Sequence, residues 1–596
     1  MVEQRKKLYE LSTGGPVTAL SPSSSPLDEY RAAFQNRAQP FLNHYTFEGG
    51  NIHKRSLTRG DFWDLACSTG AYLAEMGLTK ADRVVHLFSH NSLYDLIFRL
   101  AAVLVGCVPV TVNWQADSDE TVLYKAKVSK AKLMVYDKSF ADRVAAMKSR
   151  LLPILLLEAE QIEQSPHTGK LASPPLSYDD ERMIVFTSGT TGKPKGASLP
   201  HRSYLANRLT FEQYFGVSEK TQIDLLLVNP LHHANSTAFS DWAMRRAGTR
   251  IHLVQRYATL YWKILAKAAA SKGDLLIAPM VSRHIHFLEN LSAQSELPVA
   301  GDELKKALSQ TEMMIGSAPV GPATVKRLLK FANRLPGVRF GSTETCLEVM
   351  ATPRTMPDER LLEAFEAGWS HRYQGEPKVG YYIGRDHQPF TQIKLVKSID
   401  PESKDYFQPC EIGEPGYLVT RGPNLMSHYV GDARATNEVF RKGWYTGLRD
   451  IAFALRNKGD GELDYYWMSR DSALIIRGGA NYACDQVATE LSEVLTKDFQ
   501  LKPEQFRLAV VGLRVESEHE DSCCVTIDLG EEAADRQPQL EVDFIEKARE
   551  RVSKGARPDY VRFAKIPLSF KGEIRVPELK QDFKQLLKQK GLALHE

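Results

Sequence analysis

Residues 183–201 read "MIVFTSGTTGKPKGASLPH", and they place a loop of small, polar and cationic residues directly after an apolar run. The run at 183–186 is typical of a buried strand. The loop that follows offers backbone amides, hydroxyls and ammonium groups, which are the groups that bind phosphate. It is not a Walker loop, because the spacing GxxxxGKS/T is absent and Pro194 follows Lys193. On composition alone, a solvated turn is the alternative.

The rest of the chain repeats this change between apolar runs and amphipathic stretches. Strand-like runs such as "RVVHLF" (83–88), "DLLLVNP" (224–230) and "DLLIAPM" (274–280) alternate with helix-like stretches such as "GDFWDLACSTGAYLAEMGL" (60–78). This order predicts parallel sheets covered by helices up to about residue 400. The runs "TQIKLV", "GYLVTR" and "ELDYYWM" then predict an antiparallel, β-rich subdomain.

The predicted fold class is therefore α/β, with a large N-terminal domain of helix-covered sheets, a β-rich subdomain and a small α+β C-terminal domain. The C-terminal segment combines a helical pattern at "DQVATELSEVL" (485–495), a strand at "FRLAVVGL" (506–513) and a basic helical end. Residues 1–26 are predicted to be a flexible lead-in, because the Ser, Pro and Gly residues concentrated there bury too little surface to offset their ordering entropy.

Composition argues against several classes of protein. The 596 residues are 43% hydrophobic and 25% charged, as in soluble proteins of several domains. The net charge of +3 creates no global field that would gather nucleic acid. No apolar stretch reaches the roughly 20 residues that span a bilayer, and the start lacks a secretory pattern, so we expect a cytoplasmic protein without a membrane span. The seven scattered cysteines lack zinc spacing and predict reduced thiols.

Residues 186–201 match the signature Y/F-TSGTTGxPKGVxxxH almost throughout, with Ala197 in place of the usual valine. Further motifs follow in the same order as in the family that carries this signature. The chain therefore resembles the adenylate-forming superfamily, which includes acyl-CoA and aryl-CoA synthetases, peptide-synthetase adenylation domains, fatty acyl-AMP ligases and beetle luciferases. The resemblance extends from about Leu57 to Leu579.

The resemblance implies that the loop holds the β- and γ-phosphates of ATP while pyrophosphate leaves. Attack of a carboxylate on the α-phosphorus brings two anions together, so cationic and amide donors are needed to offset their repulsion. Lys195 is the implied catalytic cation of this loop, and Thr187 is implied to contribute to a magnesium site. The implied ATP-binding residues are Thr187, Ser188, Gly189, Thr190, Thr191, Gly192 and Lys195.

Two further motifs are implied to border the acyl group. "NPLHH" (229–233) resembles the PLxH segment, which implies that His233 lies on the acyl-pocket side of the active site. "GSAPV" (316–320) resembles the GGAPL loop, with a serine in place of one glycine. That loop is implied to contact both nucleotide and acyl group through Ser317, Ala318 and Pro319.

"FGSTE" (340–344) resembles the YGxTE element. The resemblance implies that Phe340 packs near adenine, that Thr343 contacts the α-phosphate and that Glu344 helps to hold magnesium. An aromatic face, a hydroxyl donor and a hard oxygen ligand are groups that Mg-ATP requires. The same element contributes Gly341 and Ser342 to the implied nucleotide site.

The ribose and hinge elements depart from the family pattern. "GWYTGLRDIAF" (443–453) resembles the tryptophan-containing turn that is followed by TGD, but Leu448 and Arg449 intervene before Asp450, the implied ribose ligand. "SRDSALIIRGGAN" (469–481) resembles the crossing between domains, where Arg470 is implied to contact ribose or phosphate and Ser472 falls at the hinge. Gly478 and Gly479 are implied to line the path of the incoming thiol.

These motifs divide the chain into a lead-in at 1–26, a large AMP-binding domain at 27–468, a hinge at 469–472 and a small C-terminal domain at 473–596. Members of this superfamily rotate the small domain between forming the adenylate and using it. The resemblance therefore implies that the C-terminal domain is mobile.

The largest departure from the family lies near the C-terminus. Family members show PxTxxGK followed by Ile or Val, but this chain reads "PLSFKGEIRVPELK", and Glu573 occupies the position of the lysine. A carboxylate there would repel both reacting anions. Lys571 lies two residues earlier, and in an extended segment it would share a face with position 573, about 6–7 Å along the strand. We therefore predict that Lys571 supplies the missing charge.

The leading interpretation is an AMP-forming carboxylic acid ligase that uses ATP and Mg²⁺ to form an acyl-AMP, releases pyrophosphate and passes the acyl group to a thiol, most simply that of CoA. A ligase that transfers to an amine or to a separate carrier protein is one alternative. Another is a nucleotide- or acyl-AMP-binding protein that has lost adenylation, because of Glu573. The substrate is expected to be a small carboxylic acid. The motifs do not specify which acid is used, which group accepts the acyl chain, or the oligomeric state.

Overall fold

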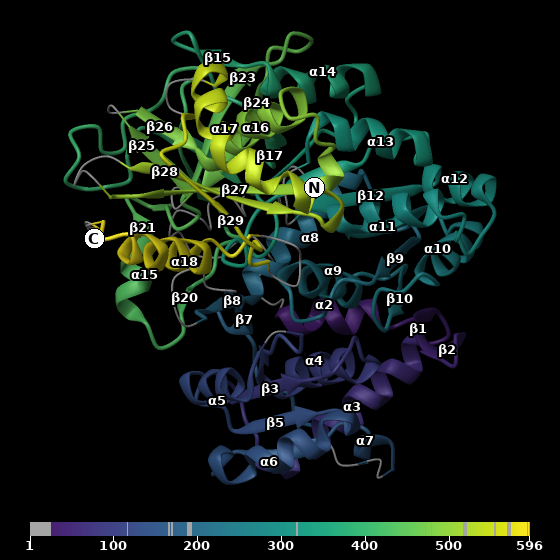
Figure 1. The fold of residues 1–596 in the computed structure, drawn as a ribbon. Helices are drawn as coiled ribbons and strands as arrows, with labels where there is room; N and C mark the ends of the chain where they lie inside the picture. Colours follow the sequence, from purple (N-terminus) through teal and green to yellow (C-terminus); the bar gives the residue numbers. More distant parts are fainter. Residues whose placement is uncertain are drawn as a thin grey trace.

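The computed structural model describes residues 25–115, 117–164, 167, 171–187, 194–316, 320–470, 473–477, 480–515, 521–552, 556–568, 574–592 and 594. Its first described helix, α2 (Pro26–Ala33), begins at the end of the predicted lead-in. Ser25 caps this helix, because its hydroxyl accepts a hydrogen bond from the backbone N–H of Leu27 and its own N–H donates to Asp28. The chain then builds two large sheets and a smaller C-terminal one, which Figure 1 colours along the sequence.

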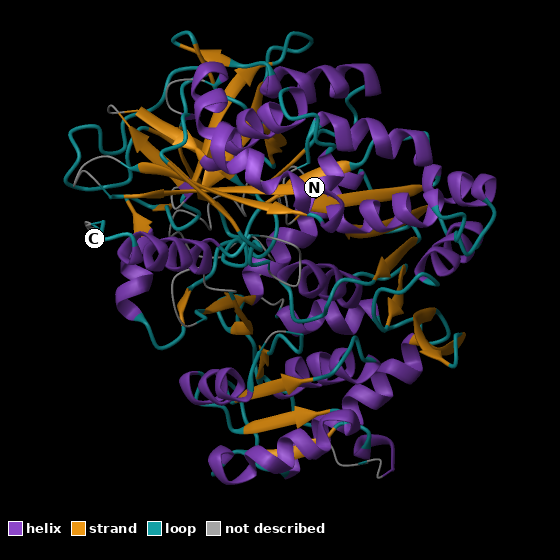
Figure 2. Cartoon of the chain, viewed as in Figure 1, coloured by secondary structure: helices purple, strands orange, loops and turns teal. Residues whose placement is uncertain are grey.

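The first large sheet lies in the lower part of Figure 1 and has the strand order β20-β8-β7-β4-β3-β5-β6. The strands from β7 to β6 run parallel. At one edge, β8 pairs antiparallel with β7, and β20 pairs antiparallel with β8. Helices lie on both sides of β3 and β5 (Figure 2). The elements are α3 (Arg59–Glu75), β3 (Arg83–Leu87), α4 (Leu93–Val105), β4 (Val108–Thr111), α5 (Asp119–Val128), β5 (Leu133–Tyr136), α6 (Ala141–Leu151), β6 (Leu155–Glu158), α7 (Gln161–Gln164), β7 (Glu181–Phe186), β8 (Gly196–Pro200) and β20 (His428–Tyr429).

The second large sheet begins with β2 and β1 and continues through the parallel strands β10, β9, β11, β12 and β13. Predicted strands at 224–230 and 274–280 are confirmed here as β9 and β11. The elements are β1 (Pro40–Glu48), β2 (Asn51–Thr58), α8 (His201–Phe215), β9 (Ile223–Leu227), α9 (Ala234–Arg245), β10 (Thr249–Val254), α10 (Tyr261–Ala270), β11 (Leu275–Val281), α11 (Ser282–Ala293), α12 (Gly301–Ser309), β12 (Thr311–Gly316), α13 (Pro322–Ala332) and β13 (Gly337–Phe340).

Beyond β13 the same sheet becomes antiparallel, which confirms the predicted β-rich region. The change comes earlier than the expected position near residue 400, because the short strand β14 already pairs antiparallel with β13 and β17. The elements of this region are β14 (Met350–Ala351), α14 (Asp358–Trp369), β15 (Arg372–Tyr373), β16 (Glu376–Pro377), β17 (Tyr381–Asp386), β18 (Gln392–Val396), β19 (Gly416–Arg421), α15 (Ala433–Val439), β21 (Phe440–Arg441), β22 (Trp444–Tyr445), β23 (Asp450–Arg456) and β24 (Leu463–Arg470).

The C-terminal segment packs around its own apolar core, centred on the helix α16 and the sheet β27-β28-β29. Strand β24 of the second large sheet contacts both α16 and β26 of this segment. The mixture of helices and strands agrees with the predicted α+β pattern. The elements are β25 (Leu474–Arg477), β26 (Ala480–Ala483), α16 (Cys484–Lys497), β27 (Phe506–Leu513), β28 (Ser522–Leu529), α17 (Gln537–Arg551), β29 (Tyr560–Phe563) and α18 (Val576–Gln589).

Strand β7 is buried on both faces, which explains its uninterrupted apolar sequence. Ile184 and Phe186 pack into the core of the first sheet, whereas Met183 and Val185 pack against the antiparallel region. This alternation follows from the two-residue period of a strand. The strand therefore carries the start of the predicted phosphate loop into the junction between the two large sheets.

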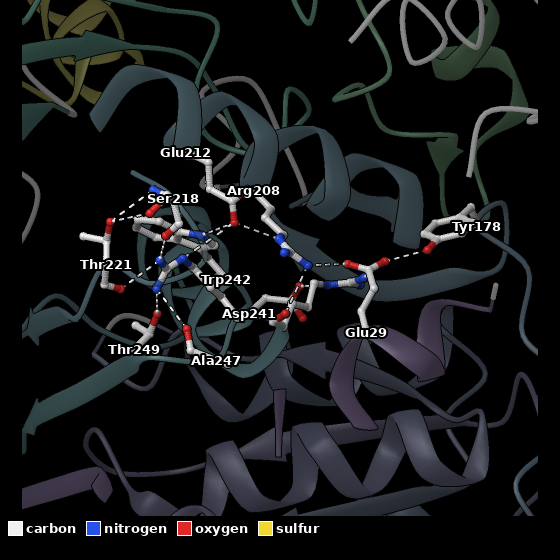
Figure 3. A network of polar contacts seen from close by, with 12 residues as sticks. Glu29, Tyr178, Arg208, Glu212, Ser218, Thr221, Asp241, Trp242, Ala247 and Thr249 are labelled. Carbon is white, nitrogen blue, oxygen red and sulfur yellow. Dashed lines mark hydrogen bonds and ion pairs between the residues drawn. The ribbon is translucent and has the colours of Figure 1, made fainter. Parts of the chain in front are cut away.

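A largely buried network of charges holds α2, α8 and α9 together (Figure 3). Glu29 of α2 forms ion pairs with Arg208 and with Arg245, each at 3.2 Å, and Arg245 also pairs with Asp241. Arg245 Nη2 lies 2.9 Å from Nδ1 of His201, the last residue of the signature sequence. Burial, followed by the charge of Arg245, lowers the pKa of His201 well below its usual value, so the imidazole is neutral and accepts from Arg245.

Candidate active site

Backbone contacts close the base of the predicted phosphate loop. Phe186, the last residue of β7, pairs with Gly196 at the start of β8. Beyond this pair, the N–H of Thr187 donates to the carbonyl oxygen of Lys195 at 3.0 Å. Thr187 and Lys195 therefore lie side by side at the neck of the loop, and Lys195 is exposed.

Tyr429 brings two of the predicted motifs together. Its hydroxyl donates a hydrogen bond to Glu344 Oε1 at 2.8 Å. The ammonium nitrogen of Lys195 lies 5.3 Å from the centroid of the same ring, which is within the range of a cation–π contact. Lys195 and Glu344, which are far apart in the sequence, therefore meet at one side chain. No sequence pattern indicates Tyr429, because β20 has only two residues and carries no periodic signal.

The surroundings of Glu344 keep Tyr429 a hydrogen-bond donor. Burial, followed by the charge of Glu344, raises the pKa of Tyr429 above its usual value, so the hydroxyl stays protonated. The hydroxyl oxygen of Tyr445 lies 3.4 Å from that of Tyr429, and burial together with Glu344 also raises the pKa of Tyr445. Both tyrosines therefore border Glu344 as neutral groups.

The "FGSTE" segment forms a tight turn after β13. A Cβ atom on Gly341 would lie 1.8 Å from the carbonyl oxygen of Leu347, so the close approach of the two backbones requires glycine. Phe340 and residues 342–344 are half-buried. The turn therefore holds the predicted adenine, α-phosphate and magnesium residues on a fixed backbone while leaving them partly accessible.

The "NPLHH" segment leads directly into α9, for which His233 is the N-cap residue. The N–H of His233 donates to the carbonyl oxygen of Pro230 at 3.0 Å, and its side chain is half-buried. His232 is buried, with its ring centroid 5.8 Å from that of Trp114 in an edge-to-face contact. The backbone of His233 is thus fixed at the start of α9, and its role at an acyl pocket stays a prediction.

Asn91, which belongs to none of the predicted motifs, holds this segment in place. The side-chain amide donates to the carbonyl oxygens of Val228, Asn229 and Val254 at 3.0–3.2 Å. Its oxygen accepts from the N–H of Leu231 at 2.8 Å. The fully buried Asn91 therefore joins β9, β10 and the start of the histidine segment. No motif signals this role, because the partners are all backbone groups.

We predict that Asn91→Ala lowers the free energy of unfolding of the protein by roughly 2–4 kcal/mol, since it leaves several buried backbone groups without a partner. Urea unfolding followed by fluorescence measures the change. Asn51→Ala, at an exposed position of β2, is the matched control and should change the free energy by less than about 0.5 kcal/mol. Equal stability of the two variants would contradict the prediction.

The structure brings together Asp450, the predicted ribose ligand, and Arg470, which is predicted to contact ribose or phosphate. They are paired across β23 and β24, and Arg470 Nε lies 3.6 Å from Asp450 Oδ1. Trp467 Nε1 donates to the same carboxylate oxygen at 2.8 Å. Asp450 is buried, whereas the Arg470 side chain is 55% exposed. Trp467 is not one of the predicted site residues. Its hydrogen bond fixes the orientation of the Asp450 carboxylate, the group that is predicted to bind the ribose.

The two residues that interrupt the TGD-like element have distinct structural roles. Leu448 is buried and packs in the core of the antiparallel region. Arg449 adopts a left-handed backbone conformation, with φ +54°, which turns the chain into β23. Asp450 then begins that strand. The insertion therefore lets Asp450 enter β23 opposite Arg470 despite the altered spacing.

Comparison with known proteins identifies the family of the chain. A family model described as "AMP-binding enzyme" matches residues 34–430. The chain belongs to the AMP-binding enzyme family. The predicted resemblance to adenylate-forming enzymes is thereby confirmed, as is the prediction of an AMP-forming ligase.

Curated relatives of this AMP-binding enzyme match most of its length at low identity. The mitochondrial medium-chain acyl-CoA ligase ACSF2 of Mus musculus is 25% identical over 559 residues, which cover 87% of this chain and 81% of the relative. Feruloyl-CoA synthase of an Amycolatopsis species is 26% identical over 427 residues, which cover 70% of this chain and 74% of the relative.

The solved structure of ATP-bound MatB from Rhodopseudomonas palustris is similar to this AMP-binding enzyme, with a TM-score of 0.72 and 18% sequence identity. The match covers 94% of this chain and all of that chain. At this identity the likeness establishes the fold, and it confirms the predicted α/β architecture with a smaller C-terminal part.

Several predicted site residues of this AMP-binding enzyme lie outside the described residues. Leu568 and Ile574, which flank one such segment, form an isolated antiparallel bridge. The roles assigned to these positions stay predictions. They are Ser188, Gly189, Thr190, Thr191, Gly192, Ser317, Ala318, Pro319, Ser472, Gly478, Gly479, Lys571 and Glu573.

Glu344 offers a carboxylate oxygen of the kind that binds magnesium together with ATP. Within the described ranges, no three His, Cys, Asp or Glu side chains gather into a metal site formed by protein alone. Magnesium that accompanies a nucleotide needs only one or two protein oxygens, because phosphates and waters supply the other ligands. Glu344, whose Oε1 is oriented by Tyr429, can supply such an oxygen, with Thr187 at the neck of the loop as the second predicted donor.

Across the part of the chain that the structure describes, no helix combines the length and apolar character needed to cross a membrane.

Proposed function

We propose that this AMP-binding enzyme activates a carboxylic acid with ATP, forms an acyl-AMP, releases pyrophosphate and then transfers the acyl group to the thiol of CoA. The observation that carries the proposal is the contact of both Lys195 and Glu344 with Tyr429. A cation for phosphate and a carboxylate for magnesium are the two charges that an ATP-dependent adenylation requires at one place.

In this mechanism the chain acts by positioning charges. Lys195 and the donors of the adjacent loop would hold the β- and γ-phosphates and offset the charge that develops on pyrophosphate. Thr343, on the turn fixed by Gly341, would donate to the α-phosphate. Magnesium held by Glu344 and Thr187 would neutralise part of the phosphate charge when bound. Asp450, oriented by Trp467, would accept hydrogen bonds from the ribose hydroxyls.

Two curated relatives support CoA as the acceptor, since their names describe an acyl-CoA ligase and a CoA synthase. The same names describe a medium-chain acyl group and a feruloyl group, so the relatives do not agree on one acid. We therefore propose a small carboxylic acid as the substrate without choosing its class. His233, at the start of α9, is the residue proposed to border the acyl pocket.

We propose that residues 27–468 and 473–596 are domains that move about a hinge at 469–472. Their mutual contacts include the Lys378 ammonium, which lies 5.4 Å from the ring centroid of Tyr482. Burial raises the pKa of Asp485, at the start of α16, and burial followed by the charge of Asp485 raises the pKa of Tyr381 in β17. Polar and aromatic contacts of this kind suit an interface that separates during a reaction cycle.

We predict that Ser472→Pro impairs thioester formation and adenylation to different extents, because proline restricts backbone rotation at the proposed hinge. Single-turnover rates of the two half-reactions measure the effect. Ser472→Ala preserves backbone rotation and serves as the control. Equal slowing of both half-reactions by Ser472→Pro would count against domain movement at this position.

Product analysis tests the proposed function directly. The purified chain is incubated with ATP, Mg²⁺ and a panel of carboxylic acids, with and without CoA, and acyl-AMP, AMP and acyl-CoA are quantified by mass spectrometry. The proposal requires acid-dependent AMP formation and an acyl-CoA product. Acyl-AMP that accumulates and is not converted by CoA would favour transfer to an amine or to a separate carrier protein.

The alternative that rests on a specific observation is a binding protein without adenylation activity. Its basis is Glu573, a carboxylate at the position where the family has a lysine. Such a protein would bind ATP or acyl-AMP through Lys195, Glu344 and Asp450 but form no adenylate from any acid. The same product analysis separates the two functions.

A further inference from the structure

Tyr429 is 5% exposed, yet both parts of its side chain contact residues that are proposed to bind ATP. The Lys195 ammonium nitrogen lies over the ring, 5.3 Å from its centroid, and the hydroxyl donates to Glu344 at 2.8 Å. A residue that only filled the core would need neither contact. The two contacts differ in kind, so the ring and the hydroxyl can be tested separately.

We propose that Tyr429 is a positioning residue that couples Lys195 to Glu344, so that the phosphate-binding cation and the magnesium-binding carboxylate are held in one arrangement before ATP binds. The inference rests on the proposed function, because it assumes that both residues bind Mg-ATP. It adds a residue that none of the sequence motifs assigned, and it gives that residue a defined task.

The backbone around Tyr429 is fixed to both partner segments. β20 pairs with β8, so that Tyr429 lies opposite Ala197, close to Lys195 in the chain. The N–H of Val430 donates to the carbonyl oxygen of Gly196 at 2.8 Å. On the other side, the N–H of Met426 donates to the carbonyl oxygen of Glu344 at 2.7 Å. A shift of the backbone at Gly196 or at Glu344 would therefore also shift β20 or the residues next to it.

Further contacts fix the conformation of β20 itself. The N–H of Tyr429 donates to Thr436 Oγ1 at 2.9 Å, which ties the strand to α15. The hydroxyl oxygen of Tyr445 lies 3.4 Å from the Tyr429 hydroxyl. Tyr429 is thus held both by its backbone N–H and by its hydroxyl group. Such contacts are expected of a residue whose function depends on the orientation of its side chain.

A tyrosine at this position also keeps two opposite charges apart. Among the described residues, Lys195 and Glu344 form no ion pair with each other, although both contact Tyr429. A direct pair would satisfy the ammonium and the carboxylate and reduce the attraction of each for phosphate or magnesium. The neutral ring and hydroxyl orient both groups while leaving their charges for the ligand.

The test compares ATP binding by wild type, Tyr429→Phe, Tyr429→Leu and Tyr382→Phe, measured by isothermal titration calorimetry with Mg²⁺ and with EDTA. Tyr429→Phe removes the hydroxyl and keeps the ring. It should weaken Mg-ATP binding about tenfold, on the scale of one charge-assisted hydrogen bond, and change binding in EDTA less than about twofold. Tyr429→Leu also removes the ring, and it should weaken binding under both conditions by about tenfold.

Tyr382→Phe is the matched control. Tyr382 in β17 is also a buried tyrosine, and its hydroxyl donates a hydrogen bond to the Asp464 carboxylate at 2.8 Å. It should bind ATP as wild type does under both conditions. Thermal unfolding without ligand identifies any variant that does not fold, and Tyr429→Phe keeps the test decisive should Tyr429→Leu fail to fold.

A double variant shows whether Tyr429 acts through Glu344. Glu344→Gln combined with Tyr429→Phe should bind Mg-ATP as Glu344→Gln does alone, because both changes remove the same contribution. Wild-type binding by Tyr429→Phe in Mg²⁺, or additive losses in the double variant, would overturn the inference while leaving the proposed function intact. Absence of ATP binding by the wild type would instead overturn the proposed function and the inference with it.

Discussion

Glu344→Gln is expected to slow adenylate formation roughly 30- to 1,000-fold, which corresponds to about 2–4 kcal/mol of lost transition-state stabilisation. The reason is charge, because glutamine cannot replace a carboxylate that holds a divalent cation against the phosphates of ATP. Single-turnover formation of acyl-AMP at saturating ATP measures the loss. The Mg²⁺ concentration required for half-maximal activity should rise as well.

Lys195→Ala is expected to cause a loss in the same range, because it removes the cation beside the departing pyrophosphate. Lys220→Ala and Glu219→Gln, at exposed positions after α8, are matched controls and should leave the rate unchanged. Wild-type rates in both active-site variants would contradict the assignment of Lys195 and Glu344 to the nucleotide site.

The second large effect is expected at Lys571. If this lysine replaces the one missing at Glu573, Lys571→Ala should slow adenylation by tens- to hundreds-fold, on the scale of one charged stabilising contact. Transfer of the acyl group from supplied acyl-AMP to CoA should change little, because that step no longer joins the carboxylate to ATP. Single-turnover assays of the two half-reactions separate these outcomes.

Glu573→Lys serves as the comparison, because it restores the family pattern at the same place. A silent Lys571→Ala change combined with a large gain in Glu573→Lys would mean that the native chain adenylates poorly and is a thioester-forming or binding member of the family. A robust native rate that Lys571→Ala leaves untouched would mean that another cation meets the carboxylate.

The spacing of apolar residues predicts many of the helices and strands, because it depends on which residues of a single element are buried. The apolar run at 183–186 lies within β7, and the amphipathic stretch at 60–78 contains most of α3. The start of the antiparallel region was expected too late, because β14 has only two residues and its pairing with β13 and β17 depends on contacts distant in sequence.

The candidate site was predictable only where its residues belong to motifs. Lys195 and Glu344 were identified in this way, but Tyr429, which contacts both, lies in a two-residue strand without a pattern. Asn91 was missed because it binds backbone carbonyl groups of other elements. Residues that position a site through tertiary contacts leave no periodic signal in the chain.

The central claim is that distant motifs meet to form a site for carboxylate adenylation, and ATP–pyrophosphate exchange tests it most directly. The wild-type chain is incubated with ATP, Mg²⁺ and labelled pyrophosphate in the presence of each acid of a panel, and incorporation of label into ATP is measured. We predict exchange that depends on a particular class of acid and that Glu344→Gln reduces by more than about 30-fold. Binding of Mg-ATP without exchange for any acid in the panel would contradict the claim.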